Sequence, residues 1–94
     1  DGGFEVLAVQ RAPITGPSKC LIECKRYHPE NREGVGVIRS LLGVVVDQGA
    51  TKGILATTSF FTGGATEFQE RNCNVLSLGD YDDVRNWLSH LRLL

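Results

Sequence analysis

The chain has 94 residues, with 10 lysines and arginines against 11 aspartates and glutamates, so its formal net charge is −1. An apolar fraction of 41% and a charged fraction of 22% are typical of one small globular domain, which excludes a collagen-like repeat, a disordered tail and a disulfide-dense miniprotein. No apolar run approaches the ~20 residues that cross a membrane, and the near-neutral charge argues against the strongly basic surface of many nucleic-acid binders.

The first half of the chain predicts a hairpin followed by a helix. Residues 4–10 and 19–25 are rich in apolar and β-branched side chains and predict two strands, and the turn-forming residues of segment 11–18 predict a loop between them. The polar segment 28–34 predicts a second loop. Apolar residues at helical spacing then predict a helix over 35–49 that ends at Gly49. We expect its buried stripe to contain Val35, Ile38, Leu42, Val45 and Val46.

The second half alternates strand and helix. Residues 52–58 and 74–78 predict strands, and residues 62–72 predict a helix that is capped by Thr62 and directs Ala65, Phe68 and Gln69 inward. Residues 80–93 predict a last helix with Asp80 as its cap and with Val84, Trp87, Leu88 and Leu91 on one apolar stripe, so that Trp87 is expected in the core. The order β-β-α-β-α-β-α predicts an α/β fold with a mixed sheet flanked by helices, in a single domain over 1–94.

The cysteine pattern argues against disulfides and against zinc. The three cysteines, Cys20, Cys24 and Cys73, are an odd number with no CxxC spacing, and only His28 lies near the first two. A structural zinc site needs four ligands. We therefore expect free thiols in a reducing compartment, with His28 as a loop residue.

A charged pair at the end of the second predicted strand is the main candidate for chemistry. Strand alternation places Leu21, Glu23 and Lys25 on one face, and the matching face of the first strand carries Asp1 and Glu5. Carboxylates that face one another repel unless a divalent cation neutralises them, and hard oxygen ligands suit Mg²⁺ or Mn²⁺. The alternative is a solvated Glu-x-Lys ion pair on a sheet edge, and the spacing by itself favours that alternative.

The segment around this pair resembles a known family. Residues 22–27, Ile-Glu-Cys-Lys-Arg-Tyr, resemble the strand-end signature of the Mrr-type restriction endonuclease domain, within the PD-(D/E)xK nuclease superfamily. The opening Asp-Gly-Gly-Phe-Glu of residues 1–5 is similar to that family's Asp-Gly-Gly-aliphatic-Asp segment. Residues 37–43 resemble its first core helix, and the Ala-Thr-Lys-Gly-Ile run that begins at residue 50 resembles its next strand. The match covers nearly the whole chain in one register.

The resemblance implies a metal-dependent DNA endonuclease with Mg²⁺ or Mn²⁺ as cofactor. Glu23 falls on the family's metal-site residue and Lys25 on its catalytic lysine. Glu5 falls where the family most often has a metal-binding Asp; this departure keeps the carboxylate but adds a methylene. Asp1 matches the first Asp of that segment and is expected to assist metal binding. The resemblance therefore implies a site of Glu5, Glu23 and Lys25, with Asp1, Glu5 and Glu23 toward the metal.

The charge of the segment around the candidate site favours a DNA partner more than the net charge of the whole chain does. Residues 19–39 contain five lysines and arginines and three acids, which gives this segment, beside the candidate site, a net charge of +2. We expect DNA contacts from Arg26, Tyr27, Arg32 and Arg39.

The resemblance also implies partners beyond this chain. A double-strand cut needs two active sites, which favours a homodimer, and family members commonly carry a separate DNA-recognition domain. We expect a cytoplasmic protein without membrane contact. Two other hypotheses stay open at this point. One is a nuclease-like DNA-binding module whose cleavage is weakened at Glu5, and the other is a structural or oligomerisation domain.

Overall fold

A four-stranded mixed sheet with the order β1-β2-β3-β4 organises the chain. The structure, a computed structural model, describes the backbone of residues 4–12 and 16–92 and the side chains of residues 18–90. β1 (Phe4–Ala12) pairs antiparallel with β2 (Gly16–Lys25), while β3 (Lys52–Thr57) and β4 (Leu76–Gly79) extend the sheet in parallel. The helices are α1 (Val35–Asp47), α2 (Gly63–Arg71) and α3 (Tyr81–Arg92). The predicted α/β class and element order are therefore confirmed.

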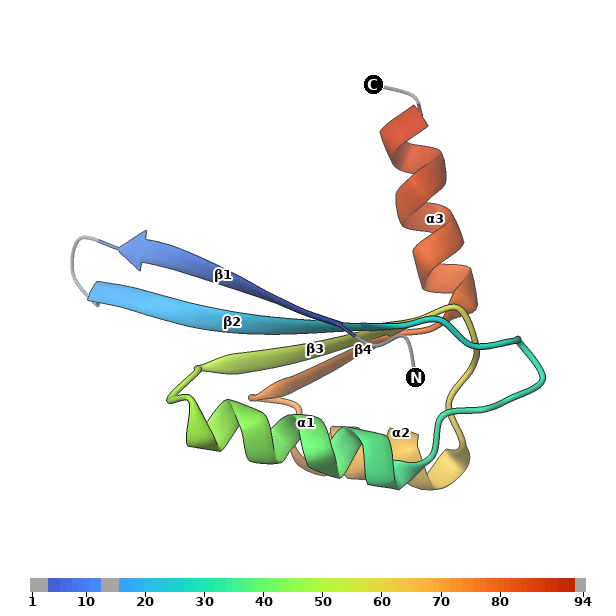
Figure 1. The fold of residues 1–94 in the computed structure, drawn as a ribbon, viewed down its shortest axis with the longest axis horizontal. Helices are drawn as coiled ribbons and strands as arrows, with labels where there is room; N and C mark the ends of the chain where they lie inside the picture. The colour runs from blue at the N-terminus through green and yellow to red at the C-terminus, as the bar shows by residue number, and fades with distance from the viewer. Residues whose placement is uncertain (1–3, 13–15, 93–94) are drawn as a thin grey trace.

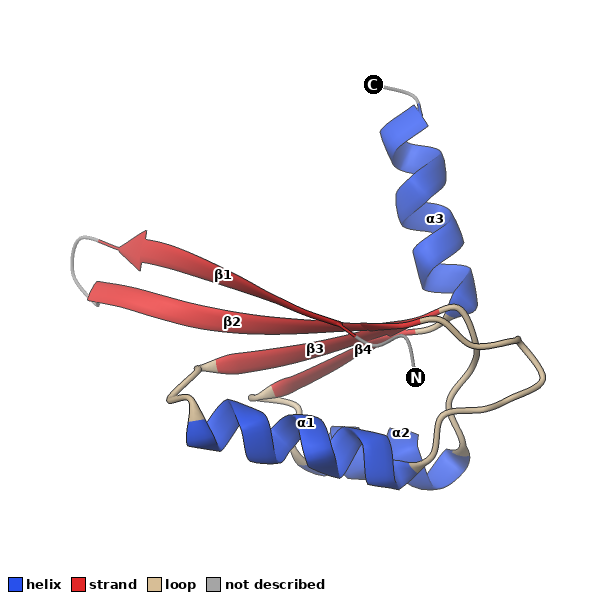
Figure 2. Ribbon diagram, viewed as in Figure 1, coloured by secondary structure: helices blue, strands red, loops and turns tan. Residues whose placement is uncertain are grey.

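The helices cover the two faces of the sheet unequally. α1 and α2 lie together against one face, and α3 projects from the other (Figures 1 and 2). A Cβ at Gly53 would lie 2.6 Å from Val45 Cγ2, so α1 packs directly on the backbone of β3. A Cβ at Gly79 would meet the ring of Trp87 instead. Because Gly53 and Gly79 project to opposite faces, these contacts assign α1 and α3 to opposite sides.

The hydrophobic core lies between the sheet and α1–α2. Its fully buried members are Leu21, Leu55 and Leu76 from the strands and Ile38, Leu41, Val45 and Ala65 from the helices. The predicted stripe of α1 is wrong at two positions, because Leu41 is buried while Val46 is 71% exposed. Both residues fit a helical period, and the contact of α1 with β3 selects the phase that faces Gly53.

The β1–β2 hairpin is longer than the sequence pattern predicts. Most of the predicted loop 11–18 belongs to the strands, since Arg11 pairs with Pro17 and Ala12 with Gly16. β3 begins to pair with β2 only at Cys20, so Pro17 lies where β2 has a neighbour on one side only. A proline lacks the backbone N–H, and it is tolerated in a strand where no second neighbour requires that donor.

The helix caps are confirmed, but the buried position of Trp87 is wrong. The Thr62 side chain accepts a hydrogen bond from the Ala65 amide at 3.2 Å, and Asp80 and Asp83 cap α3 reciprocally at 3.0 Å. Trp87 is 49% exposed and Leu88 57% exposed. Their stripe faces the more open side of the sheet, where the ring of Trp87 lies against Gly79.

Two findings concern the chemical environment of the chain. Cys20, Cys24 and Cys73 are free thiols, as expected. Among the described helices, none combines the length and the apolar character needed to cross a bilayer.

Candidate active site

Glu23 and Lys25 form an ion pair at the end of β2. Lys25 Nζ lies 3.3 Å from Glu23 Oε2, and the two side chains are only 10% and 17% exposed, respectively. Both project to the face that carries Leu21 and the core, as strand alternation predicts. The chain therefore holds a charged pair at the rim of its hydrophobic core.

This geometry differs from a solvated ion pair on an edge. β2 lies between β1 and β3, so the pair belongs to an inner strand of the sheet. Removing two charges from water costs several kcal/mol per ion unless their partners compensate. An exposed edge pair has no such cost, and the largely buried pair is therefore a stronger candidate for a functional group than its spacing alone suggested.

The structure describes the backbone of Glu5 and its position in the sheet, but not Asp1. The Cα of Glu5 is the register partner of Glu23 in the β1–β2 ladder, so the backbone brings the two positions directly opposite each other. Partners in an antiparallel ladder carry their side chains on the same face. The Glu5 side chain itself and the whole of Asp1 lie outside the described residues.

A third carboxyl group, which the sequence analysis did not single out, lies beside the pair. Glu33 is 1% exposed, and its Oε2 accepts a hydrogen bond of 3.0 Å from Thr57 Oγ1. Burial raises the pKa of the Glu33 carboxyl; the Thr57 hydroxyl and the Lys25 ammonium lower it, and the Glu23 carboxylate raises it further. The pKa stays above its ordinary value because burial outweighs the opposing contacts. The site thus contains two coupled carboxyl groups and one ammonium.

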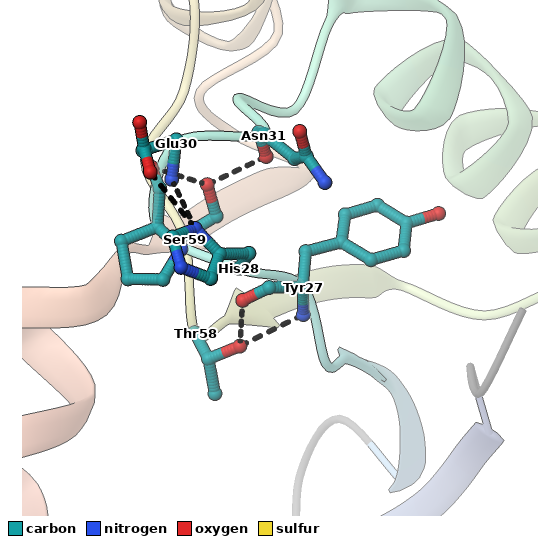
Figure 3. Close-up of polar contacts among 7 residues, drawn as sticks. Tyr27, His28, Glu30, Asn31, Thr58 and Ser59 are labelled. Atoms are coloured by element: carbon teal, nitrogen blue, oxygen red, sulfur yellow. Dashed lines mark hydrogen bonds and ion pairs between the residues drawn. The ribbon is translucent and has the colours of Figure 1, made fainter.

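Hydrogen bonds join the loop that follows β2 to the loop that follows β3 (Figure 3). The Thr58 hydroxyl accepts the Tyr27 amide at 2.8 Å and donates to the Tyr27 carbonyl at 2.6 Å. The Ser59 hydroxyl donates to the carbonyl of Asn31 at 2.6 Å, and the contacts of the exposed His28 ring are with Glu30 of the same loop. The segment after β2 is therefore fastened to the segment after β3, and the expected loop role of His28 is confirmed.

Cationic and aromatic side chains alternate next to these loops. The Arg32 guanidinium lies 5.6 Å from the Phe60 ring centroid, Phe60 meets Tyr81 edge to face at 5.8 Å, and the Arg85 guanidinium lies 5.6 Å from Tyr81. Arg32 and Arg85 are exposed. A guanidinium that stacks on a ring can still direct N–H groups to a phosphate. The row joins the segments that follow β2, β3 and β4.

The other residues expected to contact DNA are more dispersed. Arg26 is exposed and directly follows Lys25, while Tyr27 is half-buried, and its ring extends away from the Thr58 contacts (Figure 3). Arg39 lies on α1, where its guanidinium stacks 5.6 Å from Phe68 of α2. The structure therefore brings Arg26, Tyr27 and Arg32 to the loops beside the pair, whereas Arg39 contacts α2.

Comparison with known families agrees with this arrangement. Residues 1–88 match the family of restriction endonucleases described by the Mrr catalytic domain, Mrr_cat. This chain belongs to the Mrr-type restriction endonuclease family. The match includes β1, β2 and the Glu23–Lys25 pair, so the resemblance that the sequence motifs indicated is confirmed.

A solved structure shows the same fold. The chain is similar to the DNA modification-dependent restriction endonuclease AspBHI, with a TM-score of 0.67 and 20% sequence identity over 87% of this Mrr-type chain. The likeness covers 20% of AspBHI, so the chain spans about a fifth of that enzyme's length. No curated protein matches the chain at a significant level.

The oxygen ligands of this Mrr-type site fit a divalent metal ion that keeps water and substrate ligands. The described side chains contain no group of three or more His, Cys, Asp or Glu residues that could enclose an ion. Mg²⁺ is usually bound by one or two carboxylates together with waters and phosphate oxygens, so a full protein cage is not required. Glu23 is a described carboxylate of this kind, and the backbone of position 5 lies opposite it in register.

Glu33 and Thr57 are the described residues that the sequence analysis missed. Glu33 lies in a polar loop of ordinary composition, and Thr57 lies near the end of the predicted strand 52–58. Glu33 belongs to no motif or periodic stripe, and Thr57 follows the alternation of β3 without a signal that marks it as functional. Their meeting depends on the folding of the loop over β3, which no local sequence signal reports.

Proposed function

We propose that this chain is a metal-dependent endonuclease domain that hydrolyses phosphodiester bonds in DNA, with Glu23 and Lys25 at its centre. The observation that carries the proposal is the largely buried Glu23–Lys25 ion pair, 3.3 Å long, on an inner strand of an Mrr-type domain. A Mg²⁺ or Mn²⁺ ion held by Glu23 and Glu5, assisted by Asp1, would stabilise the charge that develops on the phosphate oxygens.

The residues of the chain would divide the remaining work. The Lys25 ammonium, at the strand end, would orient the attacking water or donate a hydrogen bond to an oxygen of the scissile phosphate. The Glu23 carboxylate would hold Lys25 in the resting protein and accept the cation in the active one. Closure by the fastened loops would limit solvent access around the pair, which strengthens each electrostatic contact.

DNA contacts would come from the loops at the same end of the sheet. Arg26, Tyr27 and Arg32 follow β2 directly, and the row from Arg32 to Arg85 extends the cationic surface toward α3. Arg39, stacked on Phe68, would contact a more distant part of the duplex backbone. A homodimer would supply the second site for a double-strand cut, and a recognition domain fused to this one would supply sequence choice. The free thiols support a reducing cytoplasm as the location.

A plasmid-cleavage assay with Mg²⁺ or Mn²⁺ tests the proposal. Lys25→Ala should lower kcat by about 10²- to 10³-fold, since it removes a charge aimed at the transition state. Glu23→Gln should abolish the response to metal. Lys52→Ala is the matched control, because Lys52 begins β3 at the opposite end of the sheet, and its loss should leave the cleavage rate near that of the wild type.

Two results would overturn parts of this proposal. Cleavage that survives both Lys25→Ala and Glu23→Gln would remove the site assignment. A protein that never cleaves but retards DNA in a gel would favour the binding module with weakened cleavage, for which the glutamate at position 5 is the supporting observation.

A further inference from the structure

One carboxylate oxygen of Glu33 lacks a partner in the part of the chain that the structure describes. Its Oε2 accepts the Thr57 hydroxyl at 3.0 Å, whereas Oε1 is buried and makes no hydrogen bond. The Thr57 hydroxyl also accepts the Ser59 amide at 3.1 Å, so its proton is directed to Glu33. A buried polar atom without a partner destabilises the folded state. An apolar residue at position 33 would avoid this cost.

The backbone of Glu33 is fixed in place. Its amide donates to the Phe60 carbonyl at 2.8 Å, and its carbonyl accepts the Thr62 amide at 3.0 Å. The residue forms an isolated parallel bridge with Phe61. These contacts attach the loop before α1 to the loop after β3, and they carry the Glu33 side chain under the end of the sheet.

The register of the sheet brings this carboxylate to the Glu23–Lys25 pair. Thr57, which holds Glu33, is the Cα partner of Lys25 in the β2–β3 ladder, so their side chains share one face. The charges of Lys25 and Glu23 both act on the pKa of Glu33, in opposite directions. The three side chains therefore form one electrostatic group.

A cation at Glu23 would disturb the resting ion pair. It would compete with the Lys25 ammonium for the carboxylate oxygens and would repel that ammonium as a like charge. An ammonium has three protons and needs acceptors that fix its direction. A buried acceptor under the strand end would keep the direction of the Lys25 ammonium fixed when the metal binds.

We propose that Glu33 is a positioning residue for Lys25: its buried carboxylate takes over the Lys25 ammonium when Glu23 binds a divalent cation. The inference rests on the proposed nuclease function and extends it to a residue outside the motif. Glu33 touches neither metal nor DNA in this arrangement. It acts through Lys25, and the unpartnered Oε1 is the atom that would accept the ammonium.

The chain is suited to a direct test by NMR, because Lys19, Lys25 and Lys52 are its only lysines. The side-chain ammonium signals of the ¹⁵N-labelled protein would be recorded while Mg²⁺ is added, and Lys25→Arg would assign the Lys25 signal by its absence. In the wild type, the Lys25 ammonium should remain ordered at saturating Mg²⁺. In Glu33→Gln, the order of the Lys25 ammonium should fall on Mg²⁺ addition.

Two further variants separate position from stability. Thr57→Val keeps the Glu33 charge but removes the donor that orients it, so the loss of Lys25 order should be smaller and in the same direction. Glu67→Gln removes one charge from an exposed position on α2 and should leave the Lys25 signal unchanged. In cleavage assays, Glu33→Gln should lower kcat about 10- to 100-fold, with unchanged KM for DNA and unchanged Mg²⁺ affinity.

The outcomes distinguish this inference from the function on which it rests. A Lys25 ammonium that stays ordered in Glu33→Gln at saturating Mg²⁺ would overturn the positioning role. If Lys25 loses order in Glu33→Gln but the wild type never cleaves DNA, the positioning role is supported and the nuclease proposal is overturned. If the wild type does not cleave DNA and its Lys25 ammonium signal does not change when Mg²⁺ is added, both proposals are overturned.

Discussion

The two faces of the sheet differ in how completely helices cover them, although the same strands form both. The face under α1 and α2 carries fully buried leucines, such as Leu21 and Leu55, and ends in the Glu23–Lys25 pair. The opposite face carries half-buried cysteines and aliphatic residues, and α3 leaves Trp87 about half exposed over it. A polar site gains from a rigid, dry support. The comparison therefore explains why the charged pair lies at the rim of the covered face.

The largest contrast between the faces should appear in a pair of leucine truncations. Leu55→Ala removes a fully buried side chain from β3 and should lower the free energy of unfolding by about 2–5 kcal/mol, because a cavity remains under α1. Leu88→Ala, on the half-exposed stripe of α3, should cost far less. Urea unfolding measures both, and equal losses would contradict the distinction between the faces.

Two glycines give the next largest contrast. The added Cβ of Gly53→Ala would lie 2.6 Å from Val45 Cγ2 and 3.2 Å from Leu41 Cγ, so it should cost about 1–3 kcal/mol by displacing α1. The Cβ of Gly79→Ala would lie 2.4 Å from Trp87 Cη2, which belongs to the outer end of a half-exposed side chain.

Trp87 can turn away toward solvent, so Gly79→Ala should cost less than Gly53→Ala. Thermal unfolding gives the order of the two variants, and Trp87 fluorescence reports the ring movement expected in Gly79→Ala alone. A larger loss of stability for Gly79→Ala would show that α3 is held as firmly as α1.

Removing a helix cap should lower the free energy of unfolding by about 1 kcal/mol, and the two caps test the two faces separately. Thr62→Ala removes the cap of α2, which packs on the core through Ala65, so the whole domain should lose stability. Asp80→Ala removes the cap of α3 and should act mainly on that helix. Hydrogen exchange separates the cases: faster exchange confined to α3 is expected for Asp80→Ala, and faster exchange throughout the domain for Thr62→Ala.

The last prediction concerns a slope with pH. Because burial raises the folded-state pKa of Glu33 above its ordinary value of 4.5, the native state binds this proton more tightly than the unfolded chain does. Ionisation of Glu33 therefore lowers stability as the pH rises from that ordinary value through the raised one. Glu33→Gln cannot titrate, so its stability relative to the wild type should improve as the pH rises above the ordinary value of 4.5.

Urea unfolding across this pH range checks the sign. Glu67→Gln, at an exposed position, should show no comparable trend and serves as the control. A Glu33→Gln variant that loses stability relative to the wild type as the pH rises would mean that Glu33 is ionised favourably in the native state.

Local patterns were sufficient for much of the fold and for the placement of the Glu23–Lys25 pair. The period-2 pattern of β2 placed Glu23 and Lys25 on the core-facing side, and the register of the sheet agrees. The caps at Thr62 and Asp80 were equally predictable, because a cap depends on residues only three positions apart. In each case, the interacting groups are neighbours along the chain.

The errors share a different cause. Leu41 and Val46 both fit the period of α1, and only the approach of the helix to Gly53 selected Leu41 for burial. Trp87 is a large apolar residue of the kind that usually lies in a core, yet its helix leaves it half exposed on the less covered face of the sheet. The hairpin strands extend into both ends of the predicted loop, where Arg11 pairs with Pro17, because cross-strand pairing outweighs turn propensity there.

The sequence by itself determined the order of the elements, the family and the ionisable pair, since periodicity and motif spacing are local properties of the chain. Only the tertiary structure decided that the pair lies on an inner strand and that Glu33 joins it under the end of β3. The contact between Glu33 and Thr57 joins residues 24 positions apart. Such a contact exists only after the strands and loops have packed, and burial of its unpartnered oxygen is a property of that packing alone.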